Sequence, residues 1–166
     1  MRNSTGIVLI LLALALLFSP VHAFTADSLV ISVQPNGDAR ITFDYSLSWL
    51  EQAAVFARIA DPATELRNAF ANNAGRPVTI ESVTDHEAVF DVQGFAGVKQ
   101  ADGMTSYRTP GLSFAAAEKV LKQYWFAPLI SADFSPAVSQ VTFPDGYSVR
   151  FENQISIPSV THSVSG

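Results

Sequence analysis

The strongest constraint on the fold is a pair of alternating apolar segments joined by a short turn sequence. Leu29, Ile31 and Val33 alternate with polar or smaller residues, and the same alternation resumes over residues 41–47. Gln34-Pro35-Asn36-Gly37-Asp38 lies between them, and Asn-Gly between two period-two segments predicts a β-hairpin. The positions facing the other way on the second segment are polar: Arg40, Thr42, Asp44, Ser46 and Ser48. We therefore expect an antiparallel sheet with one buried and one polar face.

Three further hairpins follow from the same reasoning. Residues 78–83 and 88–95 flank the polar turn Thr84-Asp85-His86-Glu87. Residues 95–99 and 104–109 flank Ala101-Asp102-Gly103, and residues 138–143 and 148–157 flank Pro144-Asp145-Gly146-Tyr147. Gly and Asp-Gly at these positions are typical of tight turns.

Other segments have the period of a helix. Residues 49–60 carry one apolar stripe. A second helix is expected over residues 62–74, with Asp61-Pro62 as its start signal and Gly75 as its stop signal. A third, over residues 113–124, would place Phe114, Ala117, Val120, Leu121 and Tyr124 on one face. The predicted fold is therefore α+β, with antiparallel hairpins in one sheet or two packed sheets and two or three helices covering them. The alternative is an immunoglobulin-like β-sandwich with helical insertions, against which the helix from Ser113 counts.

The amino-terminal segment resembles an export signal. Arg2 precedes an unbroken apolar run over residues 7–18, and Pro20 precedes Val21-His22-Ala23. A charged start, an apolar centre and a small residue predict a signal peptide over residues 1–23, cleaved after Ala23. The alternative is an uncleaved membrane anchor, against which the length counts: as a helix the apolar run spans only about 18 Å, and a hydrocarbon core is about 30 Å thick. Residues 24–157 then form a single domain, followed by a flexible tail over 158–166.

Composition excludes several classes of function. The 166 residues include no Cys, which removes disulfides, thiolate metal sites and cysteine nucleophiles. With 10 basic and 15 acidic residues the net charge is -5, so nucleic-acid binding is disfavoured. A hydrophobic content of 48%, part of it in the signal, supports a packed domain rather than a disordered chain.

Part of the carboxyl-terminal half resembles a known group of sequences. The matching motifs are Tyr124-Trp125-Phe126-Ala127-Pro128-Leu129, Phe134-Ser135-Pro136, Phe143-Pro144-Asp145-Gly146-Tyr147 and Ile157-Pro158-Ser159. Over about thirty-five residues they resemble uncharacterised exported or envelope-associated proteins of archaea. The resemblance implies a cell-envelope location and no particular chemistry.

One set of residues has the order of a hydrolase triad. Gly111-Leu112-Ser113-Phe114-Ala115 is followed by Asp133 or Asp145 and then by His162. An α/β-hydrolase places its nucleophile on a mainly parallel sheet, whereas this chain reads as consecutive hairpins, and Pro110 interrupts the required strand. Ser113 is explained without chemistry as the N-cap of the expected helix.

The other candidate sites are weaker. Asp85, His86 and Glu87, with Asp91 nearby, could bind a metal, but consecutive residues on a turn point in different directions. Tyr124, Trp125 and Phe126 could line a sugar-binding surface, although they are also explained as part of the core. Glu65, Glu81 and Asp91 could supply the paired carboxylates of a glycosidase, but sequence spacing does not select a pair.

These observations assign no catalytic, cofactor-binding or metal-binding residues and no cofactor. We expect a secreted or cell-surface protein, more plausibly without enzymatic activity, that binds other envelope or extracellular proteins, for instance through a sheet edge. It would meet a membrane only through an uncleaved signal. The alternatives are a small serine or carboxylate-type hydrolase and a binding module for carbohydrate or another small ligand.

Overall fold

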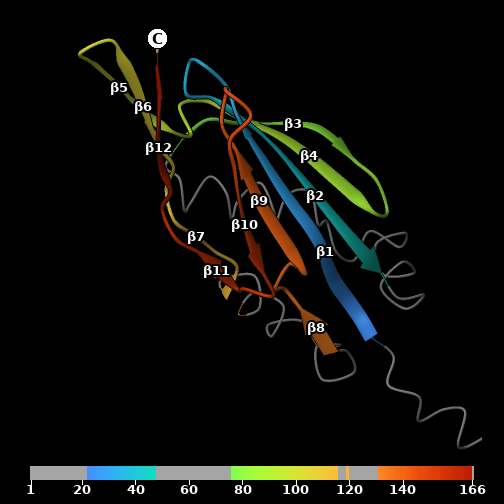
Figure 1. The fold of residues 1–166 in the computed structure, drawn as a ribbon. Coiled ribbons are helices and arrows are strands. Elements are labelled where there is room, and N and C mark those ends of the chain that lie inside the picture. Colours follow the sequence, from blue (N-terminus) through green and yellow to red (C-terminus); the bar gives the residue numbers. More distant parts are fainter. Residues whose placement is uncertain (1–21, 48–75, 116–118, 120–130, 166) are drawn as a thin grey trace, which may run out of the picture.

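Every element in the described part of the protein is a β-strand. A computed structural model describes residues 22–47, 76–115, 119 and 131–165, and Figure 1 shows the arrangement of their strands. The bounds are β1 His22–Val33, β2 Ala39–Leu47, β3 Val78–Val83, β4 Glu87–Val92, β5 Gly97–Ala101, β6 Met104–Arg108, β7 Leu112–Ser113, β8 Ser131–Asp133, β9 Val138–Thr142, β10 Ser148–Glu152, β11 Ser156–Ile157 and β12 Thr161–Ser165.

Most of these strands form one large sheet. Its order is β10-β9-β1-β2-β4-β3, and the short strand β8 also pairs with β1. Neighbours in this order are antiparallel except β1 and β9, which are parallel, as are β1 and β8. The long strand β1 lies inside the sheet and crosses the molecule diagonally in Figure 1, so two hairpins from distant parts of the sequence meet along it.

The turns adopt the conformations that their residues favour. The two Pro-containing turns are alike: Gly37 N–H donates to Gln34 C=O, and Gly146 N–H donates to Phe143 C=O. Both glycines have a left-handed backbone, with φ of 88° and 85°. Such turns place Pro early and Gly at the left-handed position. Asp102 and Gly103 both have positive φ, as a two-residue type I′ hairpin requires.

A second layer lies across one end of the large sheet. β12, β6 and β5 form a three-stranded sheet, and β7 pairs with β11. The two ladders follow one another, since Thr109 N–H donates to Val160 C=O between them and Phe114 N–H donates to Ile155 C=O beyond them. Residues 104–114 therefore run antiparallel to residues 155–165 as one bent pair of strands.

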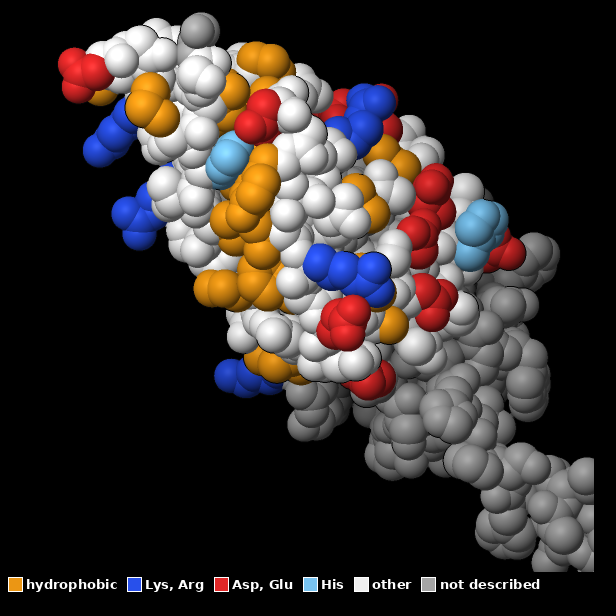
Figure 2. Space-filling view, viewed as in Figure 1, with side chains coloured by type: hydrophobic (Ala, Val, Ile, Leu, Met, Phe, Trp, Pro, Cys, Tyr) orange, Lys and Arg blue, Asp and Glu red, His pale blue; other side chains and the backbone are white. Residues whose placement is uncertain are grey.

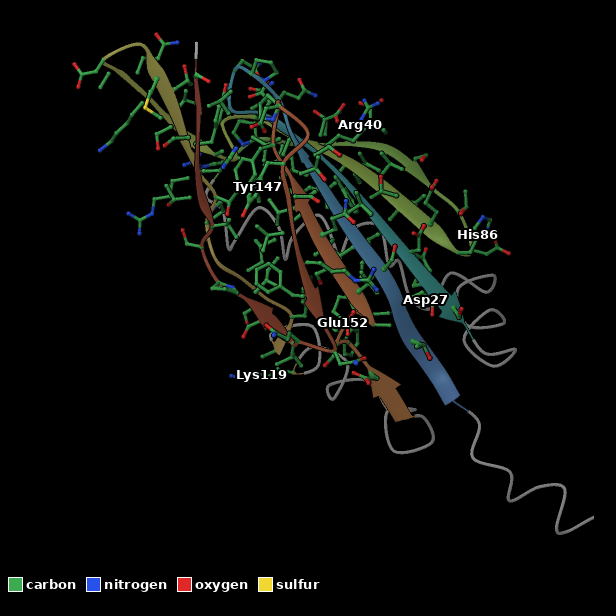
Figure 3. The ribbon with its side chains drawn as sticks, viewed as in Figure 1. Asp27, Arg40, His86, Lys119, Tyr147 and Glu152 are labelled. Carbon is green, nitrogen blue, oxygen red and sulfur yellow. The ribbon has the colours of Figure 1, made fainter. Side chains whose placement is uncertain are left out.

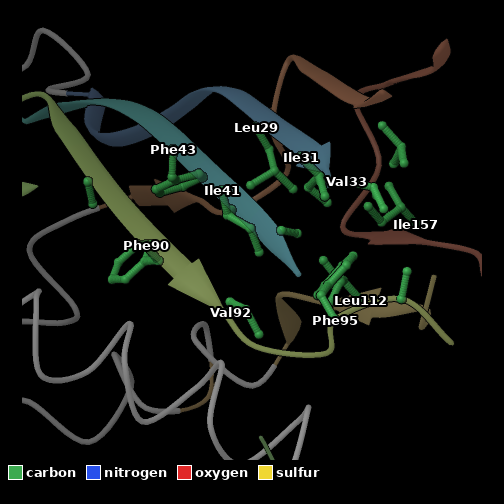
Figure 4. Packing of buried hydrophobic residues seen from close by; sticks show 14 of the residues in the cluster. Leu29, Ile31, Val33, Ile41, Phe43, Phe90, Val92, Phe95, Leu112 and Ile157 are labelled. Atoms are coloured by element: carbon green, nitrogen blue, oxygen red, sulfur yellow. The ribbon is translucent and has the colours of Figure 1, made fainter. Parts of the chain in front are cut away.

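The core lies between the two layers. The inner face of the large sheet carries Leu29, Ile31, Ile41, Phe90 and Val141, each at most 1% exposed. Figure 4 shows Phe95, Leu112 and Ile157 facing Val33 and Val92 from the second layer. This continuous buried face stabilises the fold through apolar burial. The chain has no Cys, so disulfides contribute nothing to its stability.

The predicted hairpins are confirmed and the predicted fold class is wrong. Among the described residues the fold is all-β rather than α+β. Ser113, expected at the start of a helix, lies in β7 and pairs with Ser156, because the adjacent Leu112 is buried opposite Ile157. This tertiary pairing places Ser113 itself in a strand rather than at the start of a helix. The sheets of seven, two and three strands also differ from the immunoglobulin-like alternative, in which two sheets share about seven strands.

Several predictions concern residues outside the described ones. These are residues 1–21 of the signal predicted over residues 1–23, whose last two residues lie in β1, the helices expected over residues 49–74, and the segment 120–130. In contrast, residues 161–165 were expected in a flexible tail and instead form β12, which pairs along its whole length with β6. No helix in the described ranges is long and apolar enough to cross a membrane.

Candidate functional site

A carboxylate, an imidazole and several aromatic rings meet where the turn between β9 and β10 contacts β12. His162 Nε2 lies 2.7 Å from Asp145 Oδ2. The imidazole stacks on Tyr147, with ring centroids 4.2 Å apart and planes 13° from parallel. Its centroid also lies 5.1 Å from that of Phe143. We call Phe143, Asp145, Tyr147 and His162 the turn cluster; Figure 3 labels Tyr147 at its place beside β10.

Local structure positions each member of the turn cluster. Asp145 sits at the corner of the turn, and its Oδ1 accepts a hydrogen bond of 3.1 Å from Tyr147 N–H. His162 and Val164 point inward from β12, whereas their neighbours Thr161, Ser163 and Ser165 are exposed. The period-two pattern of β12 thus aims the imidazole at the turn.

The hydrogen bond between Asp145 and His162 favours the charged carboxylate. It is the main reason that the pKa of Asp145 lies below its usual range, and the Tyr147 N–H lowers the pKa further. The His162 side chain is 19% exposed and that of Asp145 is 33% exposed. The pair is therefore accessible from solvent at its edge, while the rings cover the rest.

The other Pro-containing turn, between β1 and β2, is held by Tyr107, the cross-strand neighbour of His162. Tyr107 of β6 lies opposite His162, and its hydroxyl donates a hydrogen bond of 3.2 Å to Pro35 C=O. Gly94 N–H donates to Asp38 Oδ1 and Ala96 N–H donates to Gly37 C=O in the same region. Tyr107 and His162 therefore each attach the second layer to one turn of the large sheet.

The structure brings Asp145 and His162 together but places Ser113 elsewhere. Ser113 pairs with Ser156 and His162 pairs with Tyr107, so the two sites are six positions apart on the bent strand pair. At about 3.3 Å per residue this is roughly 20 Å. Ser113 is also exposed while His162 points inward. A base must lie within hydrogen-bond reach of its nucleophile, so these three residues form no triad.

The remaining candidates have structural partners in the described part of the chain. Asp133 Oδ1 accepts the N–H of Ser135. His86 Nδ1 lies 2.7 Å from Asp85 Oδ1 at the exposed tip of the β3–β4 hairpin, where His86 is labelled in Figure 3. That contact, the largest cause, lowers the pKa of Asp85. Asp91 receives two hydrogen bonds from Arg40, at 2.9 and 2.8 Å, and its pKa is likewise lowered.

No metal-binding group is assembled from these acids. The described residues contain no group of three or more His, Asp or Glu side chains placed to hold a metal ion. Glu81 is the extra residue at a register shift in β3. Glu65, Tyr124, Trp125 and Phe126 lie outside the described residues.

The free edge of β10 is a feature that the sequence analysis did not single out. Among the described strands β10 is the last one of the large sheet, and its register with β9 runs unbroken from Ser148 to Glu152. Exposed apolar side chains flank it, since Tyr147 before it is 50% exposed and Ile155 after it is 36% exposed. The alternation of Ser148, Arg150 and Glu152 with Val149 and Phe151 is the sequence signal that marks such a strand.

Comparison with protein families, with curated proteins and with solved structures finds no match to this chain.

Proposed function

We propose that the protein is an exported domain of the cell envelope that acts without catalysis, by binding another protein through strand addition at the free edge of β10. Export follows from the signal-like pattern over residues 1–23. Cleavage after Ala23 would leave the pairing of β1 with β2 from Phe24 onward in place. The protein would then be secreted or held at the cell surface.

The observation that carries this proposal is that β10 is the end strand of the large sheet among the described residues and has an unbroken register with β9. Phe143 N–H donates to Tyr147 C=O and Asn153 N–H donates to Ala137 C=O, which fixes the phase of the β9–β10 ladder. In that phase Val149 and Phe151 exchange hydrogen bonds with β9, while the N–H and C=O groups of Ser148, Arg150 and Glu152 point away from it. A row of unpaired groups is a template for an added strand.

The opposite edge of the sheet is less suited to the same role. β3 pairs with β4 through a register shift between Ile80 and Ser82, where Glu81 is inserted. A bulge is a device that blunts an edge against strand addition. β10 has no such shift against β9.

The hydrolase alternative has less support because Asp145 and His162 lack Ser113 beside them. Their contact is explained by its structural role, since it holds β12 against the β9–β10 turn. The carbohydrate-binding alternative depends on Trp125 and its neighbours, which lie outside the described residues.

The test compares Arg150→Pro with Arg150→Ala in the full chain, tagged and recovered from its native envelope after cross-linking. Proline removes the outward N–H at a position where an edge strand tolerates it, and alanine removes the same charge but keeps the N–H. We expect Arg150→Ala to retain the proteins bound by the wild type and Arg150→Pro to lose them, with both variants folded by circular dichroism. Equal retention by both variants would refute strand addition at β10.

A further inference from the structure

We propose that the strand added to β10 belongs to a second copy of this chain, aligned antiparallel about a two-fold axis that passes beside Phe151. This inference rests on the proposed strand addition and names its partner. Two copies of one edge form a closed interface in which the same surface is used twice.

The backbone limits how two copies of β10 can align. The outward-pointing groups belong to Ser148, Arg150 and Glu152, so these residues must lie opposite one another across the axis. The two-fold axis can satisfy that condition at three positions, which we call centres: Val149, Arg150 and Phe151. Beyond Glu152 the pairing ends, because Asn153 has a left-handed backbone with φ of 51°.

Charge selects among the three centres. An axis at Phe151 places Arg150 of each copy opposite Glu152 of the other, which forms two cross-strand ion pairs. Within one copy Arg150 Nε already lies 3.2 Å from Glu152 Oε1, so the four side chains would alternate in sign along the shared edge. An axis at Arg150 would add one hydrogen-bonded pair of residues but would place two arginines face to face, and like charges directly opposite destabilise a sheet. An axis at Val149 offers no ion pair.

The apolar side chains support the same centre. Phe151 is half-buried and points toward the inner layer. At this centre the two Phe151 residues form a pair without mutual hydrogen bonds, the type in which side chains approach most closely. Figure 2 shows a stripe of hydrophobic side chains along this side of the molecule, beside an adjacent basic and acidic pair. Tyr147 and Ile155, which flank β10 in the sequence, are exposed large hydrophobic residues.

The first experiment uses charge reversal in the purified full chain, followed by sedimentation velocity over a range of concentrations. We expect the wild type to form dimers as its concentration rises. Arg150→Glu and Glu152→Arg should each weaken dimerisation roughly tenfold or more, because each places like charges opposite one another twice. The equimolar mixture of these two variants should dimerise again, since each supplies the charges that the other lacks. Both residues are exposed, so the reversals leave the core intact.

The second experiment locates the axis with single cysteines, which is possible because the chain has none. A residue on the axis lies opposite itself, and only there can one introduced cysteine join two copies by a disulfide. We expect Phe151→Cys to give an oxidised dimer and its matched controls Val149→Cys and Arg150→Cys to remain monomeric on denaturing gels.

The outcomes separate this inference from the proposed function. A disulfide dimer through Val149→Cys or Arg150→Cys would overturn the axis at Phe151. A wild-type chain that stays monomeric at every concentration would refute the proposal that the added strand comes from a second copy of the chain. If the wild type is monomeric but Arg150→Pro abolishes the capture of envelope proteins, strand addition at β10 stands and its partner is a different protein. If the wild type is monomeric and Arg150→Pro retains those proteins, both the strand addition and the second copy are refuted.

Discussion

At the scale of single residues, the two Pro-containing turns use the same backbone in different surroundings. Gly37 is buried, and a Cβ there would lie 2.7 Å from both Ala96 O and Val98 Cγ2. Gly146 has nearly the same φ, but a Cβ there would meet nothing within 4 Å. Substitutions at Gly146 and Gly37 therefore separate two free-energy costs: that of a side chain on a left-handed backbone, and that of steric overlap with neighbouring atoms.

We predict that Gly146→Ala lowers the free energy of unfolding by about 1–2 kcal/mol, the cost of placing a side chain on a left-handed backbone. Gly37→Ala should lower it by at least about 3 kcal/mol, because the methyl group also overlaps the backbone of the β4–β5 connection. Chemical denaturation of both variants measures the difference. Equal losses would show that the β1–β2 turn can move away from Ala96.

The same scale shows which site residues could be found from sequence. Asp145 and His162 were both named, but only as members of a triad order that also required Ser113. Their contact depends on β12 being a strand, and the Ser- and Thr-rich segment from Pro158 onward has too few apolar residues to predict one. A strand with one weakly apolar face is defined by its partner, which here is β6.

At the scale of elements, the structure shows why hairpins were predictable and other pairings were not. A hairpin is encoded locally by alternation and by turn residues such as Asn36-Gly37 and Asp102-Gly103. The parallel pairing of β1 with β9 joins residues such as Ile31 and Val141, and nothing local specifies it. β7 illustrates the same limit, since nothing local to Leu112 and Ser113 specifies their pairing with Ile157 and Ser156.

The contact between β12 and the β9–β10 turn leads to a prediction about acid. The pKa of Asp145 is lowered in the folded protein, chiefly by His162, relative to about 3.9 in an unfolded chain. Its contribution to stability is therefore full above about pH 4 and is lost as the pH falls through the lowered folded pKa. We expect Asp145→Asn to reduce the free energy of unfolding at pH 6 and to have progressively less effect as the pH is lowered to 2.

The control for this prediction is made in a His162→Phe background. Phenylalanine keeps a ring that can stack on Tyr147 but cannot donate a hydrogen bond to the carboxylate. Asp145→Asn should then change the acid dependence of unfolding much less. Identical acid profiles in the two backgrounds would contradict the assignment of the shift to His162.

At the scale of the whole molecule, the described part of the protein is two layers that share one core and are also joined by contacts of β6 and β12. The polar outer face of the large sheet carries the ion pair of Arg40 with Asp91, while the inner face is closed by the second layer. β12 pairs with β6 through Thr161 to Ser165, and its inward residue His162 covers Phe143. The last strand is thus a structural part of the domain.

We predict that a chain ending at Val160 loses more than about 3 kcal/mol of unfolding free energy, because β6 loses one of its two partner strands and buried rings become exposed. The matched control is the double variant Thr161→Ala/Ser163→Ala, which alters only outward-facing side chains of β12 and should change stability by no more than about 0.5 kcal/mol. Thermal unfolding measures both. A truncated chain as stable as the full one would restore the expectation of a flexible tail.

The parallel pairing of β1 with β9 also has a mechanical consequence. In Figure 1 β1 begins near one pole of the molecule and β12 ends near the other. A pull applied between these two points runs along the strand axis, so the ladders on both sides of β1 are loaded in shear. Under shear the hydrogen bonds of a ladder share the load, whereas a hairpin pulled from its open end releases its bonds one at a time. A pull between these two ends would therefore load several hydrogen bonds of the β1 ladders together.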